Sequence, residues 1–566
     1  MKISDTKKLA AITAAFFITV AAFSGCSESA NSSQTTSSVS QAAKSDIDAS
    51  IAAEDIDVGY DEESSVGIRF ADGSAAIDGE GATSEGETVT ISQAGTYILS
   101  GTATNGRIIV SADKTAEIKL IFNGVDITCA DNAPLLVSKA KKVYIVLEDG
   151  TENVLTDSAS YSLGEDDSNT DGAIFSKADL TINGSGTLTV NANYKHGIVS
   201  KDDLVITDGN INVTSASTAM VGKDSVKISG GTFNISASTN GIKSTNTEAS
   251  DKGFISVTGG SFTVVANNDA FEAETVLSME GGSFDITTGG GSANASMKSD
   301  GTPNKNWQND MGNGGGGPNG MGRPDDNGNG TGGKPPAMPT SDDTGLTIET
   351  AANTTTDSTD TTDNTSTSAK ALKAGNEVNI SGGEFKIDSA DDSIHSNGNI
   401  VITGGNISAA SGDNGMHADG NLTISDGTVD ITKSYEGIEG SIVTIDGGTI
   451  SVVASDDGIN CAGGSDTGST DRMGADQFSS QDGVELNING GTVTIDADGD
   501  GLDSNGNFTM AGGTVYVCGP TNGGNGALDY NGTATVTGGT LIACGAVGME
   551  EGFGDNSTQS VSYTHL

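Results

Sequence analysis

Acidic and amide residues recur, singly or in pairs, shortly before an aliphatic residue in the second half of the chain. The copies are Asp391-Asp-Ser-Ile-His395, Asp413-Asn-Gly-Met-His417, Tyr435-Glu-Gly-Ile-Glu439, Asp456-Asp-Gly-Ile-Asn460 and Gly499-Asp-Gly-Leu-Asp503. Calcium takes roughly six to eight oxygen ligands from carboxylates, amides, backbone carbonyls and water, and it tolerates irregular geometry. This pattern therefore predicts calcium as a cofactor, with Asp391, Asp392, Asp413, Asp456, Asp457, Asp500 and Asp503 as candidate ligands. The alternative is that these Asp and Asn residues only cap solvated turns.

Other side chains in the same units are candidates for contact with a ligand. They are His395, His417, Tyr435, Glu436 and Glu439. The two histidines can bind a transition metal, or one can act as a base, or both can be exposed without a role. No Ser/His/Asp order, phosphate loop or nucleotide signature stands out, so we assign no catalytic residue.

A short repeat must position these residues: an alternating strand, a Gly-Gly pair, then another alternating strand. Its second glycine falls at positions 231, 260, 282, 383, 405, 427, 448, 491, 513 and 539, with steps of 22 residues recurring. Such a step, with aliphatic or β-branched residues at alternate positions, is typical of one coil of a parallel β-helix. We therefore predict an all-β fold, a right-handed parallel β-helix of about fifteen coils of about 22 residues each.

Stacking of the coils places the polar residues in columns. One predicted column holds Asp392, Asn414, Glu436, Asp457 and Asp500, and the next holds His395, His417, Glu439, Asn460, Asp503 and Asp529. Carboxylates on neighbouring strands oppose each other's ionisation, which a bound cation relieves. The same columns hold His196, Thr218 and Asn240, then Val199, Val221 and Lys243, in the earlier coils. The acidic edge is therefore expected only in the C-terminal half.

Two cysteines are also predicted to stack. Cys518 and Cys544 each lie five residues after the second glycine of a Gly-Gly pair. The spacing between neighbouring strands permits a disulfide there, and buried free thiols are the alternative.

Composition limits the partners. The 566 residues include 81 glycines and carry a formal net charge of −49. Nucleic acid is excluded as a partner, because binding to it requires Lys and Arg that neutralise phosphates. Divalent cations are favoured instead.

The N-terminus has the pattern of an export signal. Lys2, Lys7 and Lys8 precede an apolar run, which ends at Phe23-Ser24-Gly25-Cys26, a sequence that resembles a bacterial lipobox. We expect residues 1–26 to be a lipoprotein signal and Cys26 to be the lipid anchor, on the extracellular face of the cell membrane, with no other membrane contact. An ordinary cleaved signal with an incidental cysteine is the alternative.

The remaining sequence divides by composition. We expect a flexible tether at 27–85, the β-helix at 86–556, and a non-repeat, truncated or artefactual end at 557–566. Gly/Asn/Thr-rich insertions at 289–368, which contains Trp307, and at 462–482 are expected to be disordered loops.

Several longer strings resemble a family of bacterial carbohydrate-binding β-helix lipoproteins. They include His196-Gly-Ile-Val-Ser-Lys-Asp-Asp-Leu204, Ser434-Tyr-Glu-Gly-Ile-Glu439 and Gly519-Pro-Thr-Asn-Gly-Gly-Asn-Gly-Ala-Leu-Asp529. The resemblance implies a pectate-lyase-like β-helix, calcium binding, and attachment to cellulose or acidic plant polysaccharides without established lyase activity.

These observations together predict a monomeric cell-surface protein that binds polysaccharide. Calcium would bridge the acidic edge to uronate carboxylates, which a surface of −49 would otherwise repel. A calcium-dependent polysaccharide lyase and a passive surface adhesin are the alternatives, so the sequence leaves enzymatic activity open.

Overall fold

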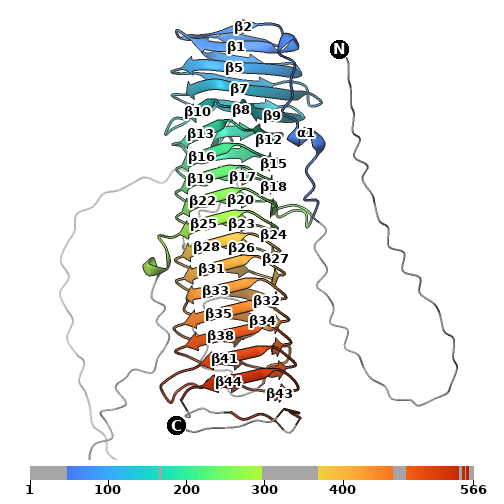
Figure 1. The fold of residues 1–566 in the computed structure, drawn as a ribbon. Coiled ribbons are helices and arrows are strands. Elements are labelled where there is room, and N and C mark those ends of the chain that lie inside the picture. Colours follow the sequence, from blue (N-terminus) through green and yellow to red (C-terminus); the bar gives the residue numbers. More distant parts are fainter. Residues whose placement is uncertain are drawn as a thin grey trace, which may run out of the picture. The chain divides into compact units, whose positions relative to one another are not determined.

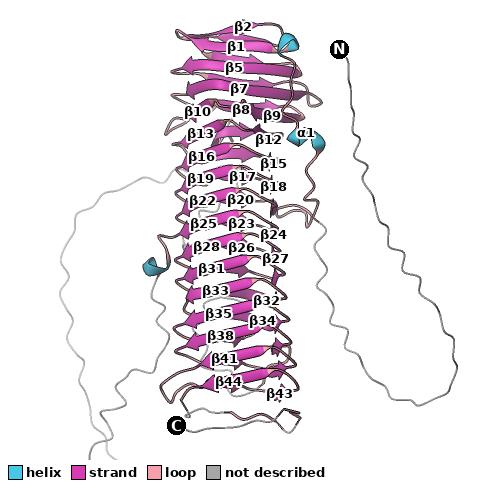
Figure 2. Ribbon diagram, viewed as in Figure 1, coloured by secondary structure: helices cyan, strands magenta, loops and turns pink. Residues whose placement is uncertain are grey.

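The computed structural model describes residues 47–164, 169–295, 368–462, 480–546, 551–554 and 556–559. All of these belong to one compact unit, residues 46–566. The regular secondary structure of its described residues is almost entirely β, with 44 strands joined in one sheet (Figures 1 and 2). The described helices are short: α1 (Ala53–Ile56) and the 3-10 helices η1 (Glu62–Ser64) and η2 (Ser292–Asn294).

Most strands pair in parallel with the strand three places further along the chain. For example, β16 (Asn210–Ser215) pairs with β19 (Thr232–Ala237), so that Asn210 lies opposite Thr232 and Ser215 opposite Ala237. Each layer thus contributes one strand to each of three stacks, which we call the first, second and third stack in chain order. Figure 1 shows third-stack strands such as β16, β19 and β22 lying one after another.

The strands of the first stack are mostly short. They are β3 (Ala82–Glu85), β4 (Thr88–Ile91), β6 (Arg107–Ser111), β8 (Leu135–Lys139), β11 (Gly172–Ser176), β14 (His196–Ser200), β17 (Met220–Gly222), β20 (Ile242–Ser244), β23 (Phe271–Ala273), β26 (Leu372–Ala374), β29 (Ile394–Ser396), the starts of β32 (Met416–Ile424) and β34 (Ile438–Ile445), β36 (Ile459–Cys461), β39 (Leu502–Ser504) and β42 (Leu528–Tyr530).

The second stack contains β9 (Lys142–Leu147), β12 (Asp179–Gly184), β15 (Asp203–Ile206), β18 (Ser225–Ile228), β21 (Phe254–Val257), β24 (Val276–Met279), β27 (Glu377–Ile380), β30 (Asn399–Ile402), the ends of β32 and β34, β37 (Glu485–Ile488), β40 (Asn507–Met510) and β43 (Ala534–Val536).

The third stack contains β5 (Gly95–Ala103), β7 (Glu117–Thr128), β10 (Glu152–Thr156), β13 (Thr187–Ala192), β16, β19, β22 (Ser261–Ala266), β25 (Ser283–Thr288), β28 (Glu384–Ser389), β31 (Asn406–Ser411), β33 (Thr428–Lys433), β35 (Thr449–Ala454), β38 (Thr492–Ala497), β41 (Thr514–Cys518) and β44 (Thr540–Cys544). The first two strands, β1 (Val66–Ala71) and β2 (Ser74–Asp78), extend the second stack, because β1 pairs with the part of β5 that lies over the second-stack part of β7. The long strands β5 and β7 extend across both the second and third stacks, since β7 pairs with both β9 and β10.

Alternating side chains build one continuous core. In the third stack, inward residues are buried and their neighbours are exposed, as in β19 and β22. The rings of Phe233, Phe262 and Phe284 stack in this core, with centroids 4.5 and 4.8 Å apart. All ten glycines predicted to turn the chain have positive φ angles, between 78° and 110°. A residue with a Cβ would be strained there, which explains the recurrence of glycine.

Residues 47–85, expected to belong to a flexible tether, instead contain α1, η1 and the strands β1 to β3. Apolar residues such as Ile68 and Phe70 enter the common core and provide the reason. Two pairs here are antiparallel, β1 with β2 and β3 with β4. Cys26, Trp307, most of both insertions and most of the last ten residues lie outside the described residues.

A segment before β1 lies across the outer face of the second stack, near α1 in Figure 1. We call residues 50–60 the N-terminal strap. The carboxylate of Asp55 is buried, lies 2.5 Å from Lys142 Nζ and accepts a hydrogen bond from the Thr181 hydroxyl. Further along, Lys119 pairs with Asp57 at 2.9 Å, and Lys227 donates to the Ser50 carbonyl. The strap therefore contacts β7, β9, β12 and β18 at once.

In the described part of the chain, no helix has the length and apolar character needed to cross a membrane.

Candidate functional site

The polar columns lie where each layer enters the first stack. Residue pairing runs from His395 to His417, Glu439, Asn460, Asp503 and Asp529, which confirms the predicted column. The other predicted column is also confirmed, because the carbonyl of each of its later members accepts a hydrogen bond from a backbone N–H of the layer before it. The N–H donors and their carbonyl acceptors are Ser393 and Asn414, Gly415 and Glu436, Gly437 and Asp457, and Gly458 and Asp500. We call these two columns, with the preceding residues Asp391, Asp413, Tyr435 and Asp456, the acidic edge.

Lysines neutralise the N-terminal half of this edge. Lys370 Nζ lies 2.6 Å from Asp392 Oδ2 and 3.1 Å from Asp391 Oδ2. Burial alone would raise the pKa of Asp392, but Lys370 and then His395 hold that pKa well below its usual range. Burial likewise opposes the charge of Lys370, yet the two carboxylates raise the Lys370 pKa. This carboxylate pair, predicted to bind calcium, already holds an ammonium group.

The lysine pairing continues into the preceding layers. Lys373 Nζ lies 3.2 Å from Asp269 and 3.5 Å from Glu272, and Lys243 Nζ lies 2.8 Å from Glu272. Sequence reasoning missed Lys370 and Lys373. Both can be found by extending the 22-residue register backward from Asp392 and His395 to the layer that follows the long insertion.

The two predicted histidines lie side by side and are buried, with ring centroids 5.0 Å apart. His395 Nδ1 lies 2.9 Å from Asp392 Oδ2, and its Nε2 lies 2.9 Å from Asn397 Oδ1. His417 Nε2 lies 3.5 Å from Asp419 and 3.8 Å from Glu439. One ligand atom from each of Asp392, His395 and His417 falls within 4.8 Å of the others, and the same holds for Asp391, Asp392 and Asp413.

The C-terminal half of the edge is not neutralised in this way. Among the residues that the structure describes, no Lys or Arg forms an ion pair with Glu436, Asp457, Asp500, Asp503 or Asp529. Burial, followed by repulsion from neighbouring carboxylates, raises the pKa of Asp457 to about 7 and that of Asp503 to about 8. Burial also raises the pKa of Asp500 to about 6 and that of Glu436 well above its ordinary value.

Neutral oxygen atoms accompany these carboxylates. Asn460 lies between Glu439 and Asp503 in its column, and its buried amide oxygen has no hydrogen-bond partner. The amide oxygen of Asn414 is buried and unpartnered too, while its amide nitrogen donates to Glu439. Buried acceptors without donors are costly, and a cation would satisfy them together with the carboxylates.

The backbone brings the remaining predicted residues into line. The Tyr435 N–H donates to the Asp413 carbonyl, and the Asp456 N–H donates to the Tyr435 carbonyl. Asp500 N–H donates to the Asp457 carboxylate at 2.6 Å, which ties two adjacent layers of the edge. All seven predicted calcium ligands therefore belong to one edge. Lys370 pairs with two of them, Asp391 and Asp392, whereas no described lysine or arginine forms an ion pair with Asp457, Asp500 or Asp503.

In the earlier layers, the column that later holds His395 and His417 is apolar and buried. Leu136, Phe175, Val199 and Val221 form a small buried cluster separate from the main core. Lys201 Nζ lies 5.2 Å from the centroid of the Phe175 ring. The column is thus apolar in these layers, and its first acidic residue after them is Glu272, which pairs in register with Lys243 and Lys373.

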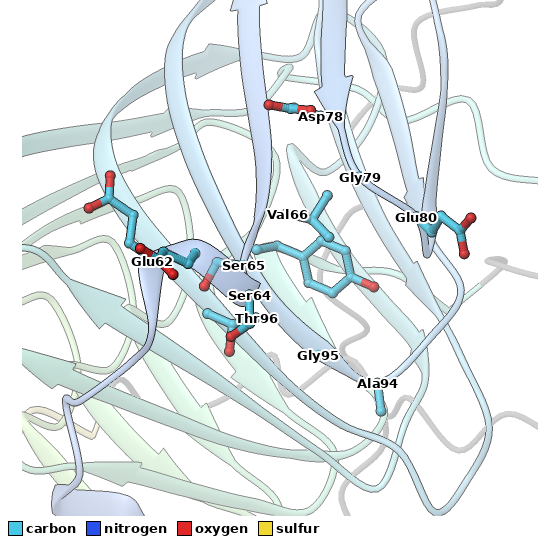
Figure 3. Close-up of a pocket in the computed structure, with 12 residues that line it drawn as sticks. Glu62, Ser64, Ser65, Val66, Asp78, Gly79, Glu80, Ala94, Gly95 and Thr96 are labelled. Atoms are coloured by element: carbon cyan, nitrogen blue, oxygen red, sulfur yellow. The ribbon is translucent and has the colours of Figure 1, made fainter.

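A separate hollow of about 570 Å³ lies near the N-terminal strands and is lined by η1, β1, β2 and β5 (Figure 3). Its walls include Glu62, Glu63, Asp78 and Glu80, together with the Tyr97 side chain. None of the predicted site residues lines it, and its carboxylates do not suit an anionic sugar.

Residues 85–415 and 416–526 match the family described as "Carbohydrate-binding domain-containing protein", which is well over half of the chain. The chain belongs to this carbohydrate-binding domain family.

A relative from Acetivibrio thermocellus, also described as a carbohydrate-binding domain-containing protein, is 45% identical over 126 residues. That match covers 22% of this chain and 44% of the relative, so the chain spans less than half of the relative's length. A solved structure of a polysaccharide lyase-like protein from C. thermocellum, a gadolinium derivative, is 38% identical. It covers 40% of this chain and 92% of its own, with a TM-score of 0.39.

Proposed function

We propose that this family member binds polysaccharide at the cell surface, and that calcium held by the C-terminal half of the acidic edge takes part. The family membership supports carbohydrate as the ligand. The observation that carries the metal proposal is the stack of buried carboxylates without a basic partner, with Asp457 and Asp503 at its centre. Their raised pKa values mean that a cation able to replace the missing positive charge is favoured there.

The calcium ligands we propose are Asp456, Asp457, Asp500 and Asp503, with Asp529 added by the register. We consider Asp391, Asp392 and Asp413 weaker candidates for calcium ligands, because Lys370 already forms ion pairs with Asp391 and Asp392. Glu436 and Glu439 border the proposed site and can contact either the metal or the sugar.

Charge also suggests how the glycan is held. The chain carries a net charge of −49, and the lysines beside the edge are already paired with carboxylates. An acidic glycan such as polygalacturonate therefore needs a bridging cation, whereas neutral cellulose meets no such repulsion. Calcium dependence should accordingly differ between the two ligands.

The framework proposed for this site is a right-handed parallel β-helix of about fifteen coils. The three stacks and the 22-residue parallel register support it. Acylation of Cys26 would anchor this monomer to the outside of the cell membrane, which is a separate proposal from the sequence.

Sedimentation of the full chain with insoluble polygalacturonate or cellulose, in calcium or in EDTA, tests the proposal. We expect polygalacturonate binding to be lost in EDTA and in the double variant Asp457→Asn/Asp503→Asn. Asp496→Asn is a matched control, because Asp496 is an exposed carboxylate on β38 of the same layer. Equal binding with and without calcium would overturn the metal bridge, and a lack of binding to any glycan would favour a passive adhesin.

A calcium-dependent polysaccharide lyase is the second candidate, favoured by the buried pair His395 and His417 beside carboxylates. A lyase needs a base that removes the proton α to the uronate carboxyl. Absorbance of unsaturated products from polygalacturonate, lost in His417→Ala, would support it. If the unaltered protein at high concentration produces no increase in this absorbance, the lyase hypothesis is wrong.

A further inference from the structure

Two exposed cysteines lie directly opposite each other on neighbouring strands. Cys518 ends β41 and Cys544 ends β44, and the parallel register pairs them. Their Sγ atoms lie 3.8 Å apart, and both side chains are exposed. We infer that Cys518 and Cys544 are a dithiol that a small external disulfide oxidises to a cross-strand disulfide.

The geometry of the two strands suits this bond. Neighbouring strands in a sheet lie about 4.8 Å apart, and disulfides bridge Cα atoms separated by about 4.4–6.8 Å. The backbone is therefore already at bonding distance, and rotation of the side chains closes the gap between the sulfurs. Cys129 and Cys461 are buried, so a reagent in solution does not reach them in the folded chain.

The reaction is thiol–disulfide exchange. One cysteine thiolate attacks a sulfur of the external disulfide, whose S–S bond breaks and releases one thiolate. The second cysteine then attacks the resulting mixed disulfide, forms the Cys518–Cys544 bond and expels the second thiolate. The two cysteine protons end on the two released thiols, so the protein loses two hydrogens and the reagent gains them.

Neighbouring thiols favour stepwise deprotonation. The hydrogen bond and charge of Cys544 raise the pKa of the Cys518 thiol. Two adjacent thiolates are thus disfavoured, but each step above needs only one. Once the mixed disulfide forms on either sulfur, the other sulfur is held beside it by the register of the sheet.

The crosslink would restrain the last layer. In the described residues, β44 pairs with β41 alone. The two cysteines are 26 residues apart, and the segment between them contains β42, β43 and Asp529 of the acidic edge. Oxidation would therefore close a loop around the whole layer and hold β44 against fraying.

Mass spectrometry of the full chain tests this inference. The protein is incubated with oxidised glutathione, unfolded, alkylated and digested. We expect the pair to lose both alkylation sites and to appear as one crosslinked peptide that separates on reduction. Cys129 and Cys461 should remain alkylated, and Cys26 is read from its own peptide. Hydrogen exchange of Thr540–Cys544 should slow in the oxidised protein.

The variants Cys518→Ser and Cys544→Ser provide the controls. Each should trap one glutathione on the remaining cysteine, because no second thiol is present to expel it. Retention of glutathione on Cys518 or Cys544 of the unaltered protein would overturn the inference. Disulfides between two chains, in place of the internal crosslink, would also overturn it. Full alkylation of both cysteines after incubation with oxidised glutathione would overturn it as well.

Discussion

Lys370 Nζ lies 2.6 Å from the Oδ2 of Asp392, a carboxylate with no exposure to solvent. The lysine belongs to the layer that follows the long insertion, and the aspartate belongs to the next layer. Their pairing neutralises a buried carboxylate with a side chain from the protein itself. It distinguishes the part of the acidic edge that is stabilised by lysine from the part whose carboxylates, among the described residues, have no ion pair with a lysine or arginine.

Removing this ammonium group should destabilise the fold. In Lys370→Met the buried Asp392 carboxylate loses its nearest positive charge, and we expect a loss of about 3 kcal/mol or more in the free energy of unfolding. Chemical denaturation followed by circular dichroism measures it. Lys386→Met is the matched control, because Lys386 and Asp285 are largely exposed and should contribute less than about 1 kcal/mol. Equal effects of the two changes would contradict the assignment of Asp392 as a buried charge.

Stability should fall as the pH rises through neutrality when no divalent cation is present. Asp457 and Asp503 have pKa values of about 7 and about 8 in the fold, against an ordinary value of 3.8. Between about pH 4 and 8 the folded chain then holds more protons than the unfolded chain, so unfolding becomes easier by up to about 1.4 kcal/mol per pH unit for each proton. Melting temperatures measured in EDTA across this range should decline, and Asp457→Asn/Asp503→Asn should flatten the decline.

Calcium should cancel this decline. A cation that binds the ionised carboxylates competes with protons, so its stabilising effect grows with pH. The melting temperature in calcium should exceed that in EDTA by more at pH 8 than at pH 5.

At low pH, Asp392 has the opposite effect on stability from Asp457 and Asp503. Its lowered pKa gives stability that is present above about pH 4 and is lost on further acidification.

The N-terminal strap offers a test with two carboxylates in one segment. Asp55→Asn leaves the largely buried Lys142 without its partner, and we expect about 3 kcal/mol of destabilisation together with proteolysis near residues 50–60. Asp57→Asn removes an exposed partner of Lys119 and should cost less than about 1 kcal/mol. Limited proteolysis followed by mass spectrometry distinguishes release of the strap from unfolding of the whole chain.

The aromatic stack in the core should be sensitive to truncation. Phe262 lies between Phe233 and Phe284, so Phe262→Ala leaves a cavity and should cost about 3–5 kcal/mol. Val265→Ala on the same strand points outward and should change the denaturation midpoint little. A similar shift for both variants would mean that the inward and outward faces of β22 are misassigned.

Much of this architecture was predictable because the sequence repeats at a fixed step. Once Gly383, Gly405 and Gly427 fix the period, alternation decides which side chains face inward, and the columns of the edge follow. The order of His395, His417 and Glu439 was predicted correctly for that reason. The repeat also placed Cys518 opposite Cys544, although the structure shows both thiols exposed where burial was one expectation.

The remaining features lie where the repeat is interrupted. Lys370 follows an insertion that hides the 22-residue register, so its pairing with Asp392 was missed. Asp55 lies in a segment without periodicity, and its burial depends on Lys142 and Thr181, more than 80 residues away in the chain. Charge compensation of this kind depends on contacts between distant segments, which composition and spacing do not reveal.

The strap also determines how tension would enter the fold. A pull from the N-terminal side meets Ser50 beside β18 before it reaches β1. The contacts of Lys227, Lys142 and Lys119 with the strap all precede β1 in the chain, so such a pull would load them before it loads β1. Breaking these contacts would be the first step of unfolding under such a pull, ahead of the separation of β1 from β5.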